Sequence, residues 1–169
     1  MEITINNFRS IRKEKYFFNE GITLIDGESG KGKTTIIEAV YWCLYGGGNN
    51  YPFKYNLKTK EFTKVELKLN DIKIFRTKPP DNVSITIKDS IFNNDEAQTN
   101  INRIFGSQSY WESSSYLKQD NRNILMSSIK SNDKIKILKE IIFGKNNEDI
   151  VQEYYNKLEK YLKETDKEI

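Results

Sequence analysis

The sequence of 169 residues contains no histidine, one cysteine and only three prolines. A single cysteine cannot form an intramolecular disulfide, which fits a reducing compartment. Without histidine, a zinc site of the usual ligand set is nearly excluded, and a histidine-based catalytic triad is impossible. No apolar run approaches the roughly 20 residues of a membrane span, and no charged-then-apolar leader follows Met1. We therefore expect an intracellular protein that makes no use of a membrane.

The residues that are present favour a folded domain, or one lobe of a larger one. Apolar residues make up 37% of the chain and charged residues 30%, but nine Phe, ten Tyr and two Trp supply bulk for a core. The net charge of +3 permits nucleic-acid binding without arguing for it.

Hydrophobic patterns divide the chain into elements. Alternation and short apolar runs predict strands at 2–5, 16–18, 65–69, 72–76 and 83–87, the last three forming an antiparallel meander with turns at 70–71 and 79–82. The β-branched run at 22–25 is typical of a strand buried on both faces. A short strand is also possible within 110–119.

Helical periodicity follows at several places. It predicts a helix from Thr34, with Ile36, Ile37, Val40, Tyr41 and Leu44 on its apolar positions and a stop at 46–48. A second helix is predicted over 95–105, with Ile101, Ile104 and Phe105 on one face and Gly106 as its cap. A third is predicted over 133–144, with Ile135, Leu138, Ile141 and Ile142 inward. Residues 151–169 show a heptad seam.

One segment carries a chemical motif. Residues 27–34 match G-x-x-x-x-G-K-[ST] at every fixed position, after a predicted strand and before a predicted helix. Such a P-loop directs backbone N–H groups and a helix N-terminus at phosphate oxygens. We expect Lys33 to bridge the β- and γ-phosphates of ATP, Thr34 to ligate Mg²⁺ and Thr35 to reach the α-phosphate. The expected nucleotide-binding residues of the loop are Gly27, Ser29, Gly30, Lys31, Gly32, Lys33, Thr34 and Thr35. Lys31 either tightens nucleotide binding or faces solvent.

The P-loop and its flanks resemble one family. ITINNFRSI, GITLIDG, GESGKGKTT and IIEAVYWCLYG arrive in the order and spacing of the N-terminal lobe of SMC-like DNA-repair ATPases. The likeness is greatest to the SbcC and Rad50 branch, with its phage and viral relatives. It implies an α/β fold, a P-loop NTPase of ABC-ATPase type, with the meander and the start of a coiled-coil helix added. It also implies that Arg9, in NFRS, lies beside the phosphates.

Two further segments support the resemblance. SSYLKQDNRNIL resembles the Q-loop of the family, which implies that Gln119 reaches Mg²⁺ and the γ-phosphate region. Lys33 and Gln119 are therefore the expected catalytic residues. The heptad seam matches the point where the family runs into a long coiled coil. We accordingly expect an ATPase lobe at 1–147 and the start of a coiled-coil helix at 148–169.

The resemblance implies an ATP hydrolase whose heads dimerise on ATP and clamp double-stranded DNA for repair or recombination. Its implied partners are the C-terminal lobe of the same ATPase, a second head and a nuclease of SbcD or Mre-eleven type. No strand ending in Asp-Glu and no signature loop follow the P-loop, and the family carries both in its C-terminal lobe. This lobe alone should therefore bind ATP weakly and hydrolyse it poorly. The alternatives are a RecF-like ATPase, a self-contained small-molecule kinase, and a scaffold with a structural P-loop.

Other residues have both a functional and a structural interpretation. Lys54, Lys58, Lys60 and Lys64 are candidate contacts to DNA phosphates, or belong to a solvated basic loop, and Arg76 and Lys78 are similar. The rings of Tyr110, Trp111 and Tyr116 either stack on bases or, as we favour, pack in the core. Cys43 is expected to be a small buried hydrophobe, and Glu38 to organise the P-loop helix without a catalytic role.

Overall fold

The computed structural model describes residues 1–47, 61–116, 135, 138, 156 and 157. Two compact units divide the chain, residues 1–101 and 102–169, and each is described by itself. Within the described ranges, no helix is both long enough and apolar enough to cross a membrane.

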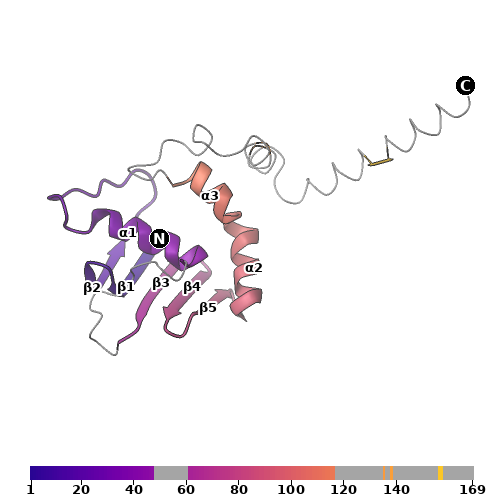
Figure 1. Ribbon diagram of the computed structural model, residues 1–169, viewed down its shortest axis with the longest axis horizontal. Helices are drawn as coiled ribbons and strands as arrows, with labels where there is room; N and C mark the ends of the chain where they lie inside the picture. The colour runs from indigo at the N-terminus through magenta and orange to yellow at the C-terminus, as the bar shows by residue number, and fades with distance from the viewer. Residues whose placement is uncertain (48–60, 117–134, 136–137, 139–155, 158–169) are drawn as a thin grey trace, which may run out of the picture. The chain divides into compact units, whose positions relative to one another are not determined.

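The first unit is built on a six-stranded sheet in the order β2-β1-β3-β4-β5-β6, in which all neighbours are antiparallel (Figure 1). Its strands are β1 (Glu2–Phe8), β2 (Ile11–Phe17), β3 (Thr63–Leu69), β4 (Ile72–Lys78), β5 (Asn82–Ile87) and β6 (Ser90–Asn93). The predicted meander is confirmed as β3-β4-β5. Its first turn lies at Asn70 and Asp71, where Leu69 faces Ile72 across the ladder.

Two strands extend beyond the prediction. β2 begins at the buried Ile11, but the four residues that follow are charged, so the apolar run marked only the last part of the strand. It is an edge strand whose Arg, Lys and Glu side chains face solvent. β6 has four residues and no clear alternation, so no periodic signal marks it. These two segments are strands because they pair with β1 and β5, and not because of a hydrophobic pattern of their own.

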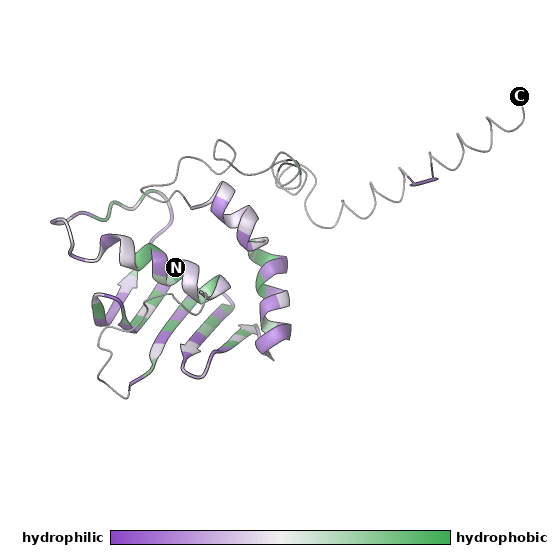
Figure 2. Ribbon diagram, viewed as in Figure 1, coloured by the Kyte–Doolittle hydropathy of each residue, from purple (hydrophilic) through white to green (hydrophobic). Residues whose placement is uncertain are grey.

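The helix α1 (Lys33–Tyr45) covers one face of this sheet, as predicted (Figure 1). The strands alternate in hydropathy, which Figure 2 shows as green and purple stripes. We call the side under α1 the covered face and the other side the open face. The core between α1 and the sheet contains Ile3, Ile5, Ala39, Trp42, Cys43, Leu44, Val65, Leu67 and Ile74. Ile37 was expected on the apolar positions, but it is 41% exposed.

The segment 22–25 is not the buried strand that its composition predicted. No described strand pairs with it, and the side chains of Ile22 and Leu24 are 102% and 86% exposed. A strand exists only where a neighbouring strand completes its backbone hydrogen bonds, and β-branched composition cannot supply that partner. An apolar segment therefore lies open to solvent immediately before the P-loop.

The helix α2 (Asn94–Phe105) confirms the helix predicted at 95–105, with Ile101 buried but Ile104 39% exposed. In the second unit, α3 (Gln108–Ser114) replaces the short strand considered for 110–119. The Ser107 hydroxyl caps α3 by accepting a hydrogen bond from the Tyr110 backbone N–H at 3.1 Å. This cap was not recognised in the sequence.

Packing in the second unit corrects one expectation and supports another. Tyr116 is buried, with its ring 5.3 Å from that of Trp111, as the core interpretation expected. Ile135 and Leu138 are helical but 51% and 42% exposed, so the inward positions predicted for them are wrong.

Candidate nucleotide-binding site

Position 32, near the end of the P-loop, requires a glycine. Gly32 is the N-cap of α1 in the left-handed region, with φ of 90° and ψ of 13°. A Cβ at this position would be strained by the positive φ, and it would lie 2.9 Å from the Ser10 hydroxyl oxygen, so the Ser10 side chain would have to turn away. Gly32 offers no side-chain cap, and the first turn of α1 has no acidic residue. The N–H groups of the helix terminus therefore remain available to an anion.

Lys33 folds back over the loop that precedes it. Its ammonium group donates hydrogen bonds to the carbonyl oxygens of Gly27 and Glu28, at 2.7 and 2.8 Å. These exposed contacts hold a positive charge beside the turn at 27–32. Lys31 points to solvent, where its ammonium group lies 3.7 Å from the Glu28 carboxylate, both side chains being largely exposed. Whether Lys31 also tightens nucleotide binding stays a prediction.

The turn between β1 and β2 lies against the first turns of α1. The hydroxyl groups of Ser10 and Thr35 are 3.1 Å apart, and Thr35 is buried. Thr35 thus reaches back to the sheet, while Thr34 is exposed. Ser10 was not among the expected site residues. Its signal was its place beside Arg9 in the NFRS segment.

Arg9 forms an ion pair with Glu38 of α1, one turn beyond Thr35. The Arg9 backbone has φ of 46°, and the two side chains are only 28% and 16% exposed. Charge-assisted contacts of this kind are stronger when partly desolvated. The pair fixes the β1–β2 turn to the P-loop helix and places the Arg9 guanidinium beside it. Glu38 thereby organises the helix, as expected.

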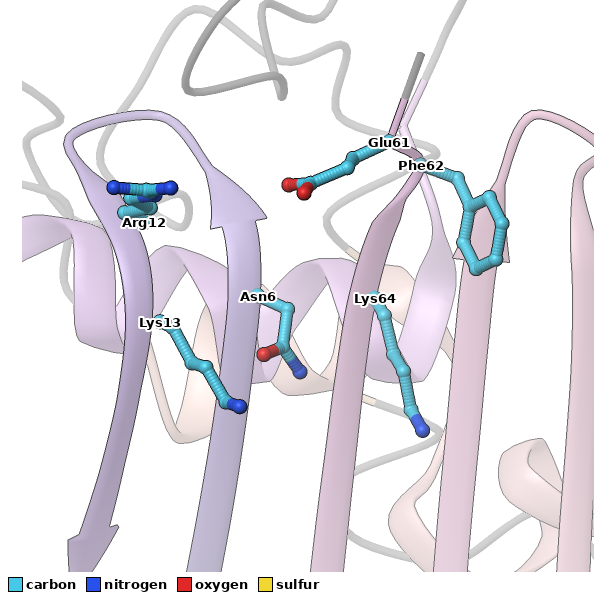
Figure 3. Close-up of a pocket in the computed structure, with 6 residues that line it drawn as sticks. All are labelled: Asn6, Arg12, Lys13, Glu61, Phe62 and Lys64. Carbon is cyan, nitrogen blue, oxygen red and sulfur yellow. The ribbon is translucent and has the colours of Figure 1, made fainter. Parts of the chain in front are cut away.

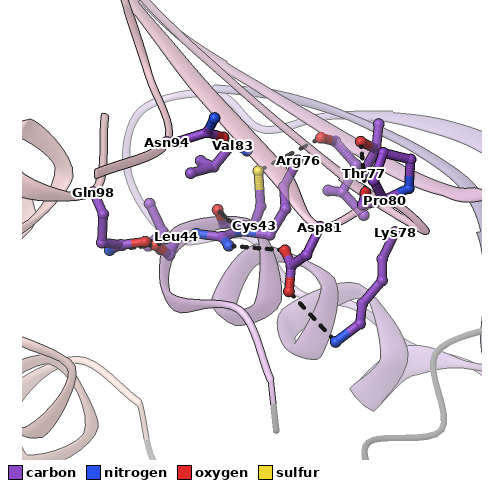
Figure 4. A network of polar contacts seen from close by, with 11 residues as sticks. Cys43, Leu44, Arg76, Thr77, Lys78, Pro80, Asp81, Val83, Asn94 and Gln98 are labelled. Atoms are coloured by element: carbon purple, nitrogen blue, oxygen red, sulfur yellow. Dashed lines mark hydrogen bonds and ion pairs between the residues drawn. The ribbon is translucent and has the colours of Figure 1, made fainter. Parts of the chain in front are cut away.

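The opposite end of α1 is held by a buried arginine (Figure 4). Arg76 of β4 donates hydrogen bonds to the carbonyl oxygens of Cys43 and Leu44, at 3.1 and 3.3 Å, and to the Gln98 side chain at 2.6 Å. Its guanidinium also lies 3.5 Å from the Asp81 carboxylate. Burial lowers the pKa of Arg76. The suggestion of a DNA contact at Arg76 is wrong, because Arg76 satisfies the last carbonyl groups of a helix.

Cys43 is a buried hydrophobe, as expected. Its thiol contacts the carbonyl oxygens of Val65 and Ile74 at 3.6 and 3.9 Å. Burial raises the pKa of Cys43 to about 12. The thiol is therefore protonated at neutral pH and forms part of the packing between α1 and the sheet.

The other predicted site residues divide into two groups. Gln119, Lys54, Lys58 and Lys60 lie outside the described residues, as do the Q-loop and most of the heptad seam. Lys64 lies on β3, with its ammonium group 4.6 Å from the centre of the Phe75 ring. The described site thus consists of the P-loop, the first turns of α1 and the β1–β2 turn.

The hydrogen-bond donors and charges of this site fit a nucleoside triphosphate with its metal ion. The loop has an uncapped helix N-terminus and the Lys33 ammonium group beside it, and both recognise phosphate oxygens. The Arg9 guanidinium lies against the same helix, where it is paired with Glu38. The exposed Thr34 hydroxyl is the oxygen ligand available to Mg²⁺.

Residues 2–169 match the family model described as an AAA domain. The chain belongs to this family. AAA domains are P-loop domains, and the antiparallel sheet with its helices makes this one an α/β domain.

Curated relatives lie in viruses, archaea and bacteria. Protein 050L of Invertebrate iridescent virus 6 is 34% identical over 148 residues, which are 88% of this chain and 13% of that protein. The Rad50 ATPase of Methanocaldococcus jannaschii, a DNA double-strand break repair protein by name, is 40% identical over 80 residues, 44% of this chain and 8% of that protein. RecF of Tropheryma whipplei, a DNA replication and repair protein by name, is 38% identical over 52 residues, 31% of this chain and 14% of that protein. The resemblance to Rad50 ATPases is thus confirmed. The chain spans about one-eighth or less of the viral and archaeal relatives.

Proposed function

We propose that this chain is the ATP-binding N-terminal part of a Rad50-type DNA-repair ATPase. The geometry of the P-loop carries the proposal. Lys33 is folded over the loop carbonyl oxygens, beside a helix N-terminus that has neither a side-chain cap nor an acidic residue. The similarity to Rad50 and RecF proteins supports DNA repair as the setting.

At this site each residue has a defined task. Lys33 and the N–H groups at the start of α1 hold the β- and γ-phosphates, and Arg9 adds a second positive charge from the β1–β2 turn. Thr34 and, by the resemblance, Gln119 would hold Mg²⁺. The metal ion, when bound, supplies neutralisation of phosphate charge. Thr35 acts through Ser10, holding the turn that carries Arg9.

The exposure of segment 22–25 supports the proposal that a partner completes the domain. Ile22 and Leu24 lie in solvent, and burial of two such side chains would stabilise an assembly by roughly 3–6 kcal/mol. We assign this role to the C-terminal lobe of the same ATPase, which would also supply the residues that activate water. The lone chain is then a weak ATP binder and a poor hydrolase.

The proposal extends to assembly. Two heads would join on ATP, because nucleotide held between them has a higher affinity for the closed pair. The closed pair would clamp double-stranded DNA, with a nuclease of SbcD type as partner. The coiled-coil helix that begins within 148–169 would join the two lobes.

Light scattering after size-exclusion chromatography tests this function. The chain would be mixed with the remainder of its ATPase, with and without Mg-ATP, and Lys33→Ala would serve as the control. We expect a complex of two heads only with both pieces and ATP, and none with Lys33→Ala. Equal assembly of the wild-type and Lys33→Ala chains would overturn the proposal, as would a chain that turns over a small acceptor by itself.

A further inference from the structure

The open face of the sheet carries a second, separate group of functional side chains. Strand register places Lys13, Lys15 and Phe17 of β2 beside the alternate residues of β1, β3 and β4 on this side. The residues on this side from those three strands are Glu2, Thr4, Asn6, Lys64, Glu66, Lys68, Lys73, Phe75 and Thr77. Five lysines and two glutamates thus share one surface.

Three of the five lysines are neutralised by the two glutamates. Lys15 and Lys68 lie 3.0 and 3.2 Å from the Glu2 carboxylate. Lys68 and Lys73 lie 3.6 and 3.5 Å from Glu66. The hydrogen bond from Lys15 is the largest of the effects that lower the pKa of Glu2, and Lys68 acts in the same direction. In this part of the open face, every one of the three lysines is therefore in an ion pair, and three positive charges meet two negative ones.

The other end of the same face is not balanced. Lys13 and Lys64 flank Asn6 in one row across three strands, and Arg12 lies near them at the start of β2 (Figure 3). Among the described residues, no carboxylate lies within ion-pair distance of these three cations. They line an open hollow of about 550 Å³ together with Asn6, Glu61 and Phe62. Three cations therefore face one carboxylate.

An exposed aromatic ring lies at the rim of this hollow. Phe62 is 54% exposed, which leaves part of its ring accessible to a stacking partner. Phe75 lies beneath the Lys64 ammonium group, which holds that cation near the surface. Cations that track a phosphate backbone, combined with an aromatic ring open to stacking, are the elements of single-strand recognition.

We propose that this hollow binds single-stranded nucleic acid. Arg12, Lys13 and Lys64 contact the phosphates, a base stacks on Phe62, and the Asn6 amide hydrogen-bonds to the strand. A duplex offers phosphates but keeps its bases stacked inside, so only an unpaired base reaches Phe62. The inference goes beyond the proposed function, because the hollow lies on the face away from α1 and needs no ATP.

Fluorescence anisotropy of the full chain tests the site, with a labelled oligothymidylate of about 15 nucleotides as probe. The double variant Lys13→Gln/Lys64→Gln should lose at least about 10-fold in affinity. The slope of log affinity against log salt concentration should become smaller by about 1.4, because two phosphate contacts are lost. The matched control Lys68→Gln/Lys73→Gln removes the same charge from the same face, but from lysines already paired. We expect the control to change affinity less than about two-fold. Equal losses in the two double variants would overturn the site.

A second variant separates single strands from duplexes. Phe62→Leu should weaken binding of the oligothymidylate by about 5-fold or more, since one stacked base is lost, and should not alter binding of an abasic oligomer. Tighter binding of a matched duplex, insensitive to Phe62→Leu, would overturn the single-strand assignment.

The ATP site is measured separately in the same samples. Lys33→Ala should keep oligonucleotide binding and lose ATP binding, whereas the open-face variants should do the reverse. The two proposals can therefore fail independently of each other. Loss of oligonucleotide binding in Lys33→Ala would contradict an independent open-face site.

Discussion

The covered and open faces of one sheet differ in how their charges are used. On the covered face, the charged side chains are few and fixed: Arg76 holds the last turn of α1, and Glu38 of α1 holds Arg9. On the open face, charges are many and exposed, and only part of them are paired. Alternation along each strand creates this separation, because neighbouring residues point to opposite sides.

The comparison explains how one small sheet would support the two binding sites that we propose. Rigid packing under α1 fixes the position of the P-loop, which a phosphate site requires. The site proposed on the open face rests instead on surface cations. Variants on the covered face should therefore alter stability and ATP binding, whereas variants on the open face should leave both nearly unchanged.

The largest effect is expected from Arg76→Ala. The change removes a buried cation that satisfies carbonyl groups at the end of α1, and should lower the free energy of unfolding by about 3–5 kcal/mol. Lys73→Ala, also on β4 but on the open face, should cost less than about 1 kcal/mol. Urea unfolding followed by circular dichroism measures both. Similar losses for the two variants would remove the distinction between the faces.

A smaller effect is expected from Gly32→Ala. Positive φ and contact with the Ser10 hydroxyl should together cost about 2 kcal/mol and weaken ATP binding. Gly21→Ala is the matched control, since Gly21 has φ of 95° but open space around its Cβ position. Gly21→Ala should therefore show only the loss of stability that the positive φ causes. Adding Ser10→Ala to Gly32→Ala should restore the part of the loss that contact with the Ser10 hydroxyl causes. No recovery by Ser10→Ala would show that the β1–β2 turn does not restrict the loop.

Glu38→Gln tests whether the ion pair positions Arg9. Without the carboxylate, Arg9 should leave its place beside the P-loop, and the Kd for ATP should rise about 5-fold, or about 1 kcal/mol. Arg9→Gln should give a similar loss, and the double variant should not add to it. Isothermal titration calorimetry measures all three, with Glu2→Gln on the open face as control. Tighter ATP binding in Glu38→Gln would mean that Glu38 competes with phosphate instead.

The smallest effect concerns Cys43. Its pKa is raised to about 12, so the folded state keeps the proton while the unfolded chain loses it from about pH 9. Stability should therefore fall as pH rises from about 9 towards 12, and a thiol reagent should not label the native chain at pH 8. Cys43→Ala should remove this contribution to the slope. Rapid labelling of the native protein at pH 8 would show that the thiol is not buried.

Local patterns predicted much of this fold. The alternation in β3, β4 and β5, the Asn70-Asp71 turn and the period of α1 all belong to the segments themselves. Segments whose state depends on a partner were harder to predict. Residues 22–25 are strand-like in composition but have no described neighbour, and β2 and β6 are strands because β1 and β5 pair with them.

The candidate site shows the same division. The motif at 27–34 located the loop and Lys33 without help from the fold, because its residues are contiguous. The Ser10–Thr35 contact and the burial of Arg76 could not be predicted from local sequence, because each joins residues from distant segments. Lys13 and Lys64, for which the described residues offer no carboxylate within ion-pair distance, likewise became a candidate pair only through strand register.

The central claim is that this P-loop binds a nucleoside triphosphate. Calorimetric titration of the full chain with Mg-ATP tests it most directly. Lys33→Ala and Lys68→Gln are compared with the wild type after thermal denaturation has shown that all three melt at the same temperature. The account predicts saturable binding in the wild type, a loss of roughly 100-fold in Lys33→Ala and no change in Lys68→Gln. Binding of Mg-ATP that is unaffected by Lys33→Ala would contradict it.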